Sequence, residues 1–212
     1  MADLRSYIFL DSLQPQVASF FATVSQGFLP IAGQASLFVE ISPGMEINRV
    51  TDVALKSTKV TPGMQIIERL YGMLEIHSES QADVRQAGAA ILQALDLKEE
   101  GRYKPQIFSS SVIRRIDDYH TMLINRTRHG NMILPGHTLF TMELAPAAYA
   151  AFAANEAEKA AEINILEIRA FGSFGRMYLG GDEKDIDVAA RAAEQAINSV
   201  TGREMKGGGG GS

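Results

Sequence analysis

The side chains that could do chemistry are few and scattered. The chain has no cysteine, which removes thiol nucleophiles, thiolate metal sites and disulfides together. The serine run Ser109–Ser111 lacks the context of a nucleophile elbow, and no G-x-G-x-x-G or Walker phosphate loop occurs. None of the four histidines has metal-ligand spacing: His77, His120, His129 and His137. The sequence therefore predicts no catalytic residues, no metal and no cofactor.

One charged pair interrupts an otherwise apolar stretch. Glu68 and Arg69 lie between the strand-like runs Gln65–Ile67 and Leu70–Ile76, at the turn that joins them. Neighbouring residues of an extended segment point to opposite sides, so only one of the two easily faces a given direction. An exposed ion pair contributes only about 0–1 kcal/mol. On the residues alone, an ordinary solvated salt bridge in a hairpin is a sufficient interpretation.

The segments that must position this pair occur twice, at a spacing of 103 residues. A period of this length indicates a duplicated domain, because the repeats of solenoid proteins are much shorter, at about 20–50 residues. We therefore expect domains over residues 1–103 and 104–206, connected by the polar segment Glu99–Pro105. The run Gly207–Ser212 has no side chains to pack and is expected to be a linker or an expression scar. The repeat pairs Gly27 with Gly130, Gly33 with Gly136, Glu40 with Glu143, Pro43 with Pro146 and Lys56 with Lys159.

Each copy is expected to run strand, helix, strand, helix, two strands, helix, which predicts an α/β (α+β) fold with helices covering a sheet. The expected strands are Tyr7–Leu10, Ser36–Ile41, Gln65–Ile67, Leu70–Ile76, Gln106–Phe108, Thr138–Leu144, Ile163–Ala170 and Phe174–Leu179. The expected helices are Gln16–Ser25, Gly44–Thr58, Ile113–Asn125 and Ala147–Ala161. The last helix of each copy has a stripe at 4, 3 and 4 spacing: Val84, Gly88, Ile91 and Leu95, then Ile186, Ala190, Ala193 and Ile197.

Composition excludes several classes of function. Hydrophobic residues make up 46% and charged residues 21%, which is typical of a soluble globular protein. The net charge of −5 argues against a nucleic-acid partner, because such proteins usually present a basic surface. No apolar run approaches the length of a membrane span, and the N-terminus lacks a signal-peptide pattern. The sequence predicts a soluble cytoplasmic protein without nucleic-acid or membrane partners.

Several separated motifs resemble those of the bacterial microcompartment shell-protein domain. They are Leu37–Gly44, Asp52–Lys56 and Glu68–Gly72, in that order. The tandem arrangement resembles the trimer-forming class, and the extra strand and helix before each core match its circularly permuted variety. The segments Asn155–Ala161 and Gly172–Arg176 are similar to the double-stacking trimers of carboxysomes and other microcompartments. The resemblance extends from about Leu4 to Glu204.

This resemblance implies an assembly. It implies a flat homotrimer with a pseudo-sixfold outline, tiled beside other shell proteins, hexamers and pentamers, in a microcompartment shell in the bacterial cytoplasm. It also implies a pore on the threefold axis for small metabolites, and pairs of trimers stacked face to face as a dimer of trimers around a chamber.

The resemblance also assigns roles to residues. It puts Glu68 and Arg69 at the pore, where swinging the arginines in or away would close or open it. Phe171, Gly172 and Ser173 hold the equivalent positions of the second copy and are expected at the pore rim, although a tight glycine turn explains them as well. Lys56 and Lys159 are implied at the outer edge of the tile; the alternative is a helix-end lysine favoured by the helix dipole.

Two other classes of function remain to be weighed. A tandem small-molecule sensor would use a pocket between domains or subunits and would bind one ligand saturably without forming sheets. An enzyme would need a catalytic constellation that the sequence does not contain.

Overall fold

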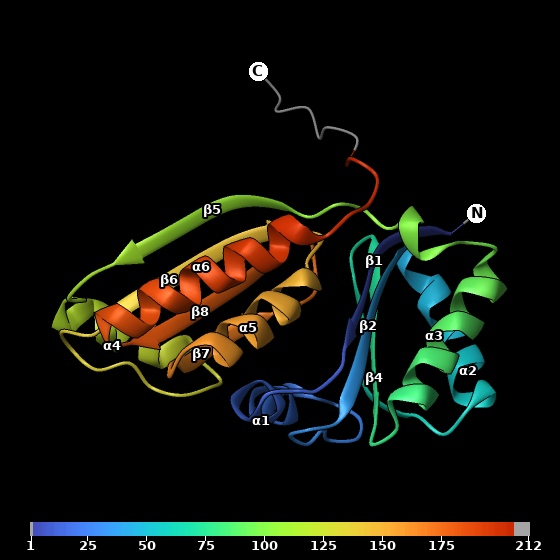
Figure 1. Ribbon diagram of the computed structural model, residues 1–212, viewed down its shortest axis with the longest axis horizontal. Coiled ribbons are helices and arrows are strands. Elements are labelled where there is room, and N and C mark those ends of the chain that lie inside the picture. Colours follow the sequence, from blue (N-terminus) through green and yellow to red (C-terminus); the bar gives the residue numbers. More distant parts are fainter. Residues whose placement is uncertain (1, 206–212) are drawn as a thin grey trace.

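The computed structural model describes residues 2–205 and contains two four-stranded antiparallel sheets, one from each half of the chain (Figure 1). The strand orders are β1-β2-β4-β3 and β5-β6-β8-β7. The first half consists of β1 (Asp3–Leu10), α1 (Pro15–Val24), β2 (Ala35–Ser42), η1 (Gly44–Glu46), α2 (Ile47–Ser57), β3 (Thr61–Glu68), β4 (Tyr71–Ser78), α3 (Gln81–Leu95) and η2 (Glu99–Gly101). The second half consists of β5 (Gln106–Ile113), α4 (Asp118–Thr127), β6 (Thr138–Ala145), α5 (Tyr149–Ala160), β7 (Asn164–Arg169), β8 (Gly175–Gly181) and α6 (Glu183–Ser199).

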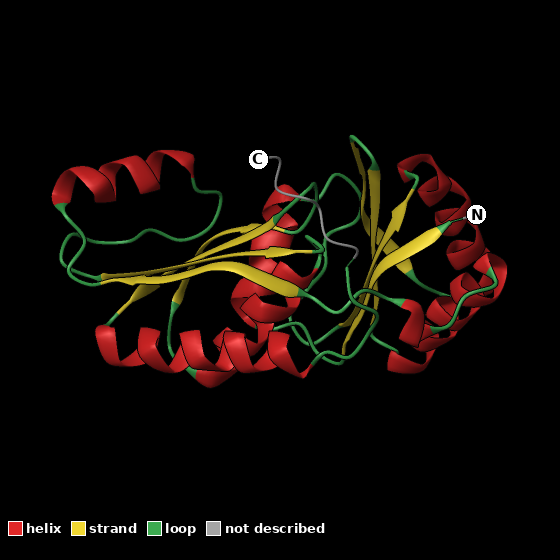
Figure 2. Cartoon of the chain, turned by 90° about the horizontal axis from the view of Figure 1, so that it is seen from above, coloured by secondary structure: helices red, strands yellow, loops and turns green. Residues whose placement is uncertain are grey.

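The same element order and the same strand order in both halves confirm the predicted α+β fold and its duplication. In the second half, α5 and α6 cover one face of the sheet and α4 lies on the opposite side (Figure 2). The predicted division at residues 103 and 104 lies between η2 and β5 and stays a prediction. The glycine-serine run Gly207–Ser212 lies outside the described residues.

The predicted apolar stripes are confirmed. All four stripe residues of α3 are buried, and so are all four of α6. Each helix therefore turns one continuous apolar face to its own sheet, as its spacing requires. Ser80 begins α3 by accepting a hydrogen bond from the Asp83 amide, which satisfies one of the unpaired amides of the first turn.

The section that leads into the second half differs from the prediction. The expected helix Ile113–Asn125 begins only at Asp118, because β5 continues through Ile113, paired with Leu139 of β6. The Asp117 side chain accepts a hydrogen bond from the Tyr119 amide and sets the start of α4. The helices after β2 and β6 also begin later than expected, at Ile47 and Tyr149, and a 3₁₀ turn precedes α2.

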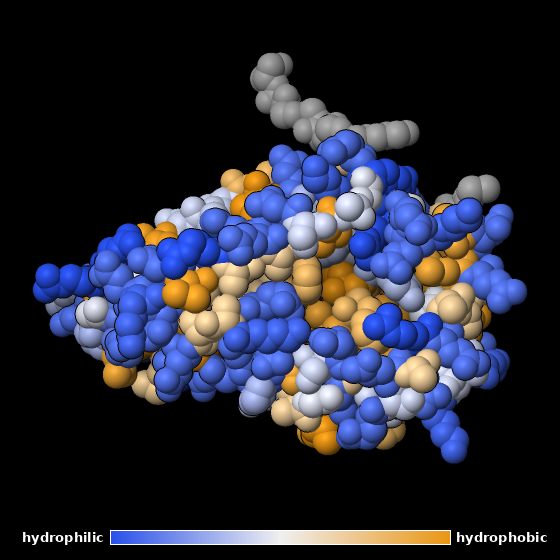
Figure 3. Space-filling model, viewed as in Figure 1, coloured by the Kyte–Doolittle hydropathy of each residue, from blue (hydrophilic) through white to orange (hydrophobic). Residues whose placement is uncertain are grey.

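The two halves share one hydrophobic core. Phe21, Phe38 and Met73 of the first half pack in one buried cluster with Ala148 and Tyr149 of the second. The face of the first sheet that turns away from α2 and α3 is therefore covered by α1 and α5. On the face drawn in Figure 3, apolar surface runs along the boundary between the halves amid mostly hydrophilic surroundings.

The equivalent face of the second sheet has no such cover. Strand β1 is largely buried, whereas its counterpart β5 is mostly exposed. Helix α1 buries four residues, whereas its counterpart α4 buries only Thr121. The chain thus completes one junction between units and leaves the matching half of a second junction open.

Candidate pore turns and the junction that positions them

The charged pair lies at the hairpin between β3 and β4. Glu68 is the last residue of β3 and pairs with Tyr71, so the turn itself consists of Arg69 and Leu70, one residue later than predicted. Arg69 adopts the left-handed region at φ 55°, which is uncommon for a residue with a side chain. Both turn residues are exposed. Among the residues that the structure describes, Glu68 and Arg69 form no ion pair with each other.

The counterpart turn of the second half has a different character. It joins β7 to β8 and contains no charged residue between Ala170 and Phe174. Gly172 is in the left-handed region at φ +93°, which favours glycine. Phe171 packs against the shared core, and Ser173 is exposed. Gly172 is itself buried, so Ser173 is the one exposed residue among the three that were predicted at the rim.

The two turns meet, although their positions in the sequence lie far apart. The carboxyl atoms of Glu68 lie 3.1 Å from the place that a Cβ atom would occupy on Gly172. The absence of a side chain on Gly172 thus makes room for the Glu68 carboxylate. The fold thus brings the predicted pore residues of both halves together where the two halves meet.

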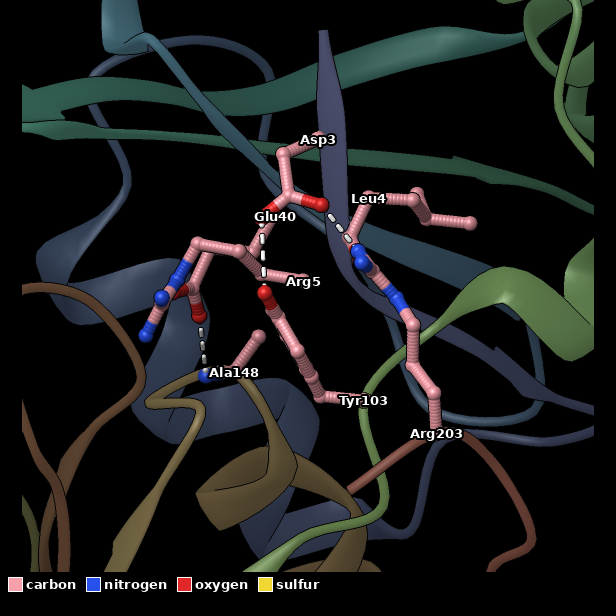
Figure 4. Close-up of polar contacts among 7 residues, drawn as sticks. All are labelled: Asp3, Leu4, Arg5, Glu40, Tyr103, Ala148 and Arg203. Atoms are coloured by element: carbon pink, nitrogen blue, oxygen red, sulfur yellow. Dashed lines mark hydrogen bonds and ion pairs between the residues drawn. The ribbon is translucent and has the colours of Figure 1, made fainter. Parts of the chain in front are cut away.

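A buried carboxylate at the junction holds this arrangement (Figure 4). Glu40 of β2 is fully buried, with Arg5 Nε donating to Oε1 at 2.5 Å and the Ala148 amide donating to Oε2 at 3.0 Å. Burial raises the pKa of Glu40 above its usual value, while Arg5 and the amides of Ala147 and Ala148 oppose the rise. Because these amides begin α5, the helix dipole also favours the negative charge.

Arginine and tyrosine side chains link this carboxylate to the turn between β3 and β4. The Arg5 guanidinium lies 3.5 Å from the centre of the Tyr71 ring, and Tyr71 is the first residue after the turn. Tyr103 Oη donates to Asp3 Oδ2 at 3.0 Å, and Arg203 also pairs with Asp3 (Figure 4). The N-terminal strand, the connecting segment and the C-terminal segment therefore meet at one place.

The two lysines predicted at the tile edge have different surroundings. Lys56 has a 75% exposed side chain and pairs with Asp52, four residues earlier, at 2.8 Å. The Lys159 side chain is 33% exposed and pairs with Glu156 at 2.9 Å and with Asp11 of the first half at 3.2 Å. Desolvation works against the charged form, but these two carboxylates raise the pKa of Lys159. Lys159 thus helps to join the halves, and the edge role stays a prediction for both lysines.

Sequence reasoning did not single out Glu40. Its signal was present, since a charged residue lies inside the apolar run Leu37–Ile41 and recurs as Glu143 in the repeat. A buried charge needs a partner, and the sequence alone does not show that a helix 108 residues later provides one.

Other kinds of site find little support. Within residues 2–205, no three histidine, aspartate or glutamate side chains gather as metal ligands, and no helix is long and apolar enough to cross a membrane. An open cavity of about 330 Å³ lies between the halves, lined in part by Tyr7, Arg102 and Tyr149. Another open cavity, of about 310 Å³, lies between α1 and the segment His129–Asn131, and a sensor domain would have to use a cavity of this kind.

Solved structures with this architecture define the class. The chain is similar to "the fused permuted hexameric shell protein MSM0275 from the RMM microcompartment", with 44% identity, a TM-score of 0.91, and coverage of 94% of this chain and 100% of that one. It is also similar to "double ringed trimeric shell protein MSM0271" from the same microcompartment, with 37% identity, a TM-score of 0.94, and coverage of 97% and 100%. The fold is that of a tandem, permuted microcompartment shell protein.

The sequence relatives identify the family. The family model of the CsoS1D N-terminal domain matches residues 4–101. Carboxysome shell protein CcmP of Synechococcus elongatus is 57% identical over 97% of this chain and 96% of its own length. Carboxysome shell protein CsoS1D of Hydrogenovibrio crunogenus is 49% identical over 96% of this chain and its own full length. The chain belongs to this family of carboxysome shell proteins, which confirms the predicted resemblance, the structural role and the place in a microcompartment shell.

We expect Glu40→Gln to destabilise the chain strongly, because it leaves the Arg5 guanidinium buried beside a neutral group. Breaking a buried ion pair typically costs about 3–5 kcal/mol. Urea unfolding followed by circular dichroism measures the change. The control Glu100→Gln, at an exposed position of η2, should leave the midpoint unchanged. Equal midpoints for the two variants would contradict the role given to Glu40.

Proposed function

We propose that three copies of this chain form a ring whose central pore is lined by the two turns, and that such rings tile into a microcompartment shell. The observation that carries the proposal is the contact between Glu68 and Gly172. It supports a common axis for both turns, because equivalent turns of two pseudo-equivalent units meet at the boundary between the halves. Three chains then contribute six turns around the pore.

The uncovered face of the second sheet supports closure into a ring. Each chain offers an open half-junction on β5 and α4, and a head-to-tail contact of this kind forms a ring when its rotation closes. The pseudo-sixfold outline follows from two units per chain. Hexamers and pentamers of other shell proteins then occupy neighbouring tiles in the shell.

The pore of such a ring carries charge on alternate turns only. Three turns present Glu68 and Arg69, while the three between them present the uncharged Ser173 beside a buried Gly172. Arg69 is exposed, so its side chain can swing toward the axis and pair with a neighbouring Glu68. Exposed ion pairs contribute about 0–1 kcal/mol each, so thermal energy or a bound metabolite is enough to change the state of the gate. Pore diameter and lining groups then select the small metabolites that pass.

Exposed apolar side chains support face-to-face stacking of two rings. Leu29 and Ile31 follow α1, and their counterparts Met132 and Leu134 follow α4; all four are exposed. Met132 and Leu134 stay exposed although the neighbouring Asn131 already donates a hydrogen bond to Gln16 of α1 across the junction. We therefore expect that the equivalent contact between chains of a ring leaves these apolar side chains uncovered as well. Because the pattern recurs in both halves, a ring repeats it six times, and a second ring of the same chain has the matching symmetry.

The edge role of Lys56 is also part of the proposal. Its exposed ammonium group at the end of α2 is available to a neighbouring tile. For Lys159 the pairing with Asp11 competes with that role, so we assign the tile contact chiefly to Lys56.

Native mass spectrometry tests the assembly. We expect the unmodified chain to give three-chain and six-chain species, and Leu29→Asp combined with Met132→Asp to leave only the three-chain ring, because burying charged groups between rings is unfavourable. The control Val188→Asp on α6 should keep the six-chain species. A monomer for the unmodified chain, or saturable binding of one small molecule without rings, would instead favour a sensor.

Electron microscopy of single rings tests the gate. We expect Arg69→Ala to reduce the fraction of closed pores, because alanine cannot reach across the axis to a carboxylate. The control Arg191→Ala, exposed on α6, should leave the distribution of closed and open pores as it is. Unchanged pore classes in the Arg69→Ala rings would show that Arg69 does not gate the pore.

A further inference from the structure

We infer that the seam between neighbouring chains of the ring repeats the junction inside one chain at a shift of 103 residues, with Glu143 of one chain accepting hydrogen bonds from the Gly44 and Met45 amides of the next. This inference rests on the proposed ring. It specifies which residues of a second copy complete the open face, and it follows from a contact that the chain already makes with itself.

The internal junction supplies the template. Inside the chain, the Glu40 carboxylate receives hydrogen bonds from the amides of Ala147 and Ala148, just before α5. Shifting these positions by 103 residues gives Glu143 on one side and Gly44 with Met45 on the other. Gly44 and Met45 begin the helical segment that leads into α2. The first amides of a helical segment have no partner within it, and they favour a negative charge nearby.

Glu143, like Glu40, is held by an arginine of its own half. Arg176 Nε donates to Glu143 Oε2 at 2.6 Å, and Arg5 Nε donates to Glu40 Oε1 at 2.5 Å. The two arginines come from different strands, since Arg5 lies on β1 and Arg176 on β8. The residue of the second half that corresponds to Arg5 is Phe108, and the residue of the first half that corresponds to Arg176 is Met73. The two carboxylates therefore lie at equivalent positions of β2 and β6, whereas their arginine partners lie on strands that are not equivalent, β1 and β8.

The difference in exposure between the two carboxylates follows from the missing partner. The Glu40 side chain is fully buried, whereas the Glu143 side chain is 33% exposed. In the internal junction, α5 covers Glu40 and the sheet face around it. The counterpart of α5 is α2, and no α2 of the same chain reaches Glu143. An α2 from a second copy is the element that would complete this site.

A second contact of the template points to the same seam. Inside the chain, Asn131 Nδ2 donates to Gln16 Oε1 at 2.7 Å. At the shift of 103, the counterparts of these two residues are Phe28 and Tyr119, which are 65% and 78% exposed. Two large aromatic side chains thus lie in water at the positions that correspond to this hydrogen-bonded pair. In the ring each covers the other, which removes apolar surface from water.

The glycine next to this contact extends the match. A Cβ atom on Gly130 would lie 3.1 Å from Phe20 Cδ2, so α1 packs closely on this part of the second half. The counterparts are Gly27 and Leu123, and Leu123 is among the exposed hydrophobic residues of α4. The seam would therefore bury Leu123 against the backbone at Gly27 of the next chain, as the junction buries Phe20.

Several contacts of the junction do not carry over. Glu158 accepts hydrogen bonds from the Gln16 and Val17 amides, but its counterpart is Leu55, whose side chain has no acceptor. The pair Lys159 and Asp11 has Lys56 and Arg114 as its counterparts, and both are cations. Each already has acidic partners in its own chain: Asp52 at 2.8 Å from Lys56, and Glu183 and Asp187 at 2.7 and 3.0 Å from Arg114. The seam thus relies on the Glu143 carboxylate and the aromatic contact, without an ion pair at its outer end.

Crosslinking between chains tests the seam, and the absence of natural cysteine makes the test specific. We expect rings that carry both Phe28→Cys and Tyr119→Cys to give two-chain and three-chain products with a short bismaleimide. The matched control combines Phe28→Cys with Val188→Cys, which is exposed on α6 and outside the seam, and should give no such ladder. Intact rings that yield no ladder from the seam pair would overturn the inference.

A second variant tests the carboxylate. Removing one partner of a buried, charge-assisted hydrogen bond typically costs 2–5 kcal/mol or so, about thirtyfold or more in affinity. We therefore expect Glu143→Gln to raise the dissociation constant of the ring by about that factor, measured by mass photometry across a dilution series, with an unchanged circular dichroism spectrum. The control Glu100→Gln should dissociate like the unmodified chain.

The outcomes separate the two proposals. If the unmodified chain forms no ring, the proposed function fails. If it forms a ring, and Glu143→Gln rings dissociate at the unmodified concentration, the seam assigned to Glu143 is wrong while the ring itself stands.

Discussion

Glu40 lies where the two halves of the chain meet, and its charge has to be matched there because no water reaches it. Arg5 provides one partner and the first amides of α5 provide the other. These three groups come from β1, β2 and the start of α5, so the carboxylate can be satisfied only when the halves dock in one orientation. Tyr71 stacks on Arg5 and directly follows the turn between β3 and β4, so the position of that turn depends on the same junction.

The same interaction accounts for the difference between the two halves. Duplication provided two equivalent carboxylates, Glu40 and Glu143, but one chain contains only one junction between its units. The first sheet could therefore become apolar on its second face, with Phe38 and Met73 in the shared core. The second sheet has Thr141 and Arg176 at the matching positions, partly open to water. A face that meets its partner only after folding has to remain compatible with water until then.

Much of the fold could be read from the sequence because it depends on local patterns. Spacing within short segments predicts the stripes of α3 and α6 and the order of strands and helices along each half. The family motifs are likewise short segments. The start of α4 was misplaced because Val112 and Ile113 are apolar in a strand as well as in a helix, and the pairing of Ile113 with Leu139 decided between them. Among the residues predicted at the pore, Glu68 was placed at the hairpin correctly to within one residue, while the packing of Phe171 depended on the shared core.

The sequence by itself determined that the chain contains two equivalent units, that each is an α+β shell domain, and that its turns differ in charge. The two units and their α+β composition follow from repeat spacing and hydrophobic periodicity, whereas the shell-domain identity follows from motifs that resemble a known family. Only the tertiary structure decided that Glu68 rests against Gly172, that Glu40 is buried beside α5, and that Lys159 is paired across the halves while Lys56 is not. Each of these contacts across the halves joins residues more than a hundred positions apart, so each depends on how two folded surfaces fit, which no local pattern encodes.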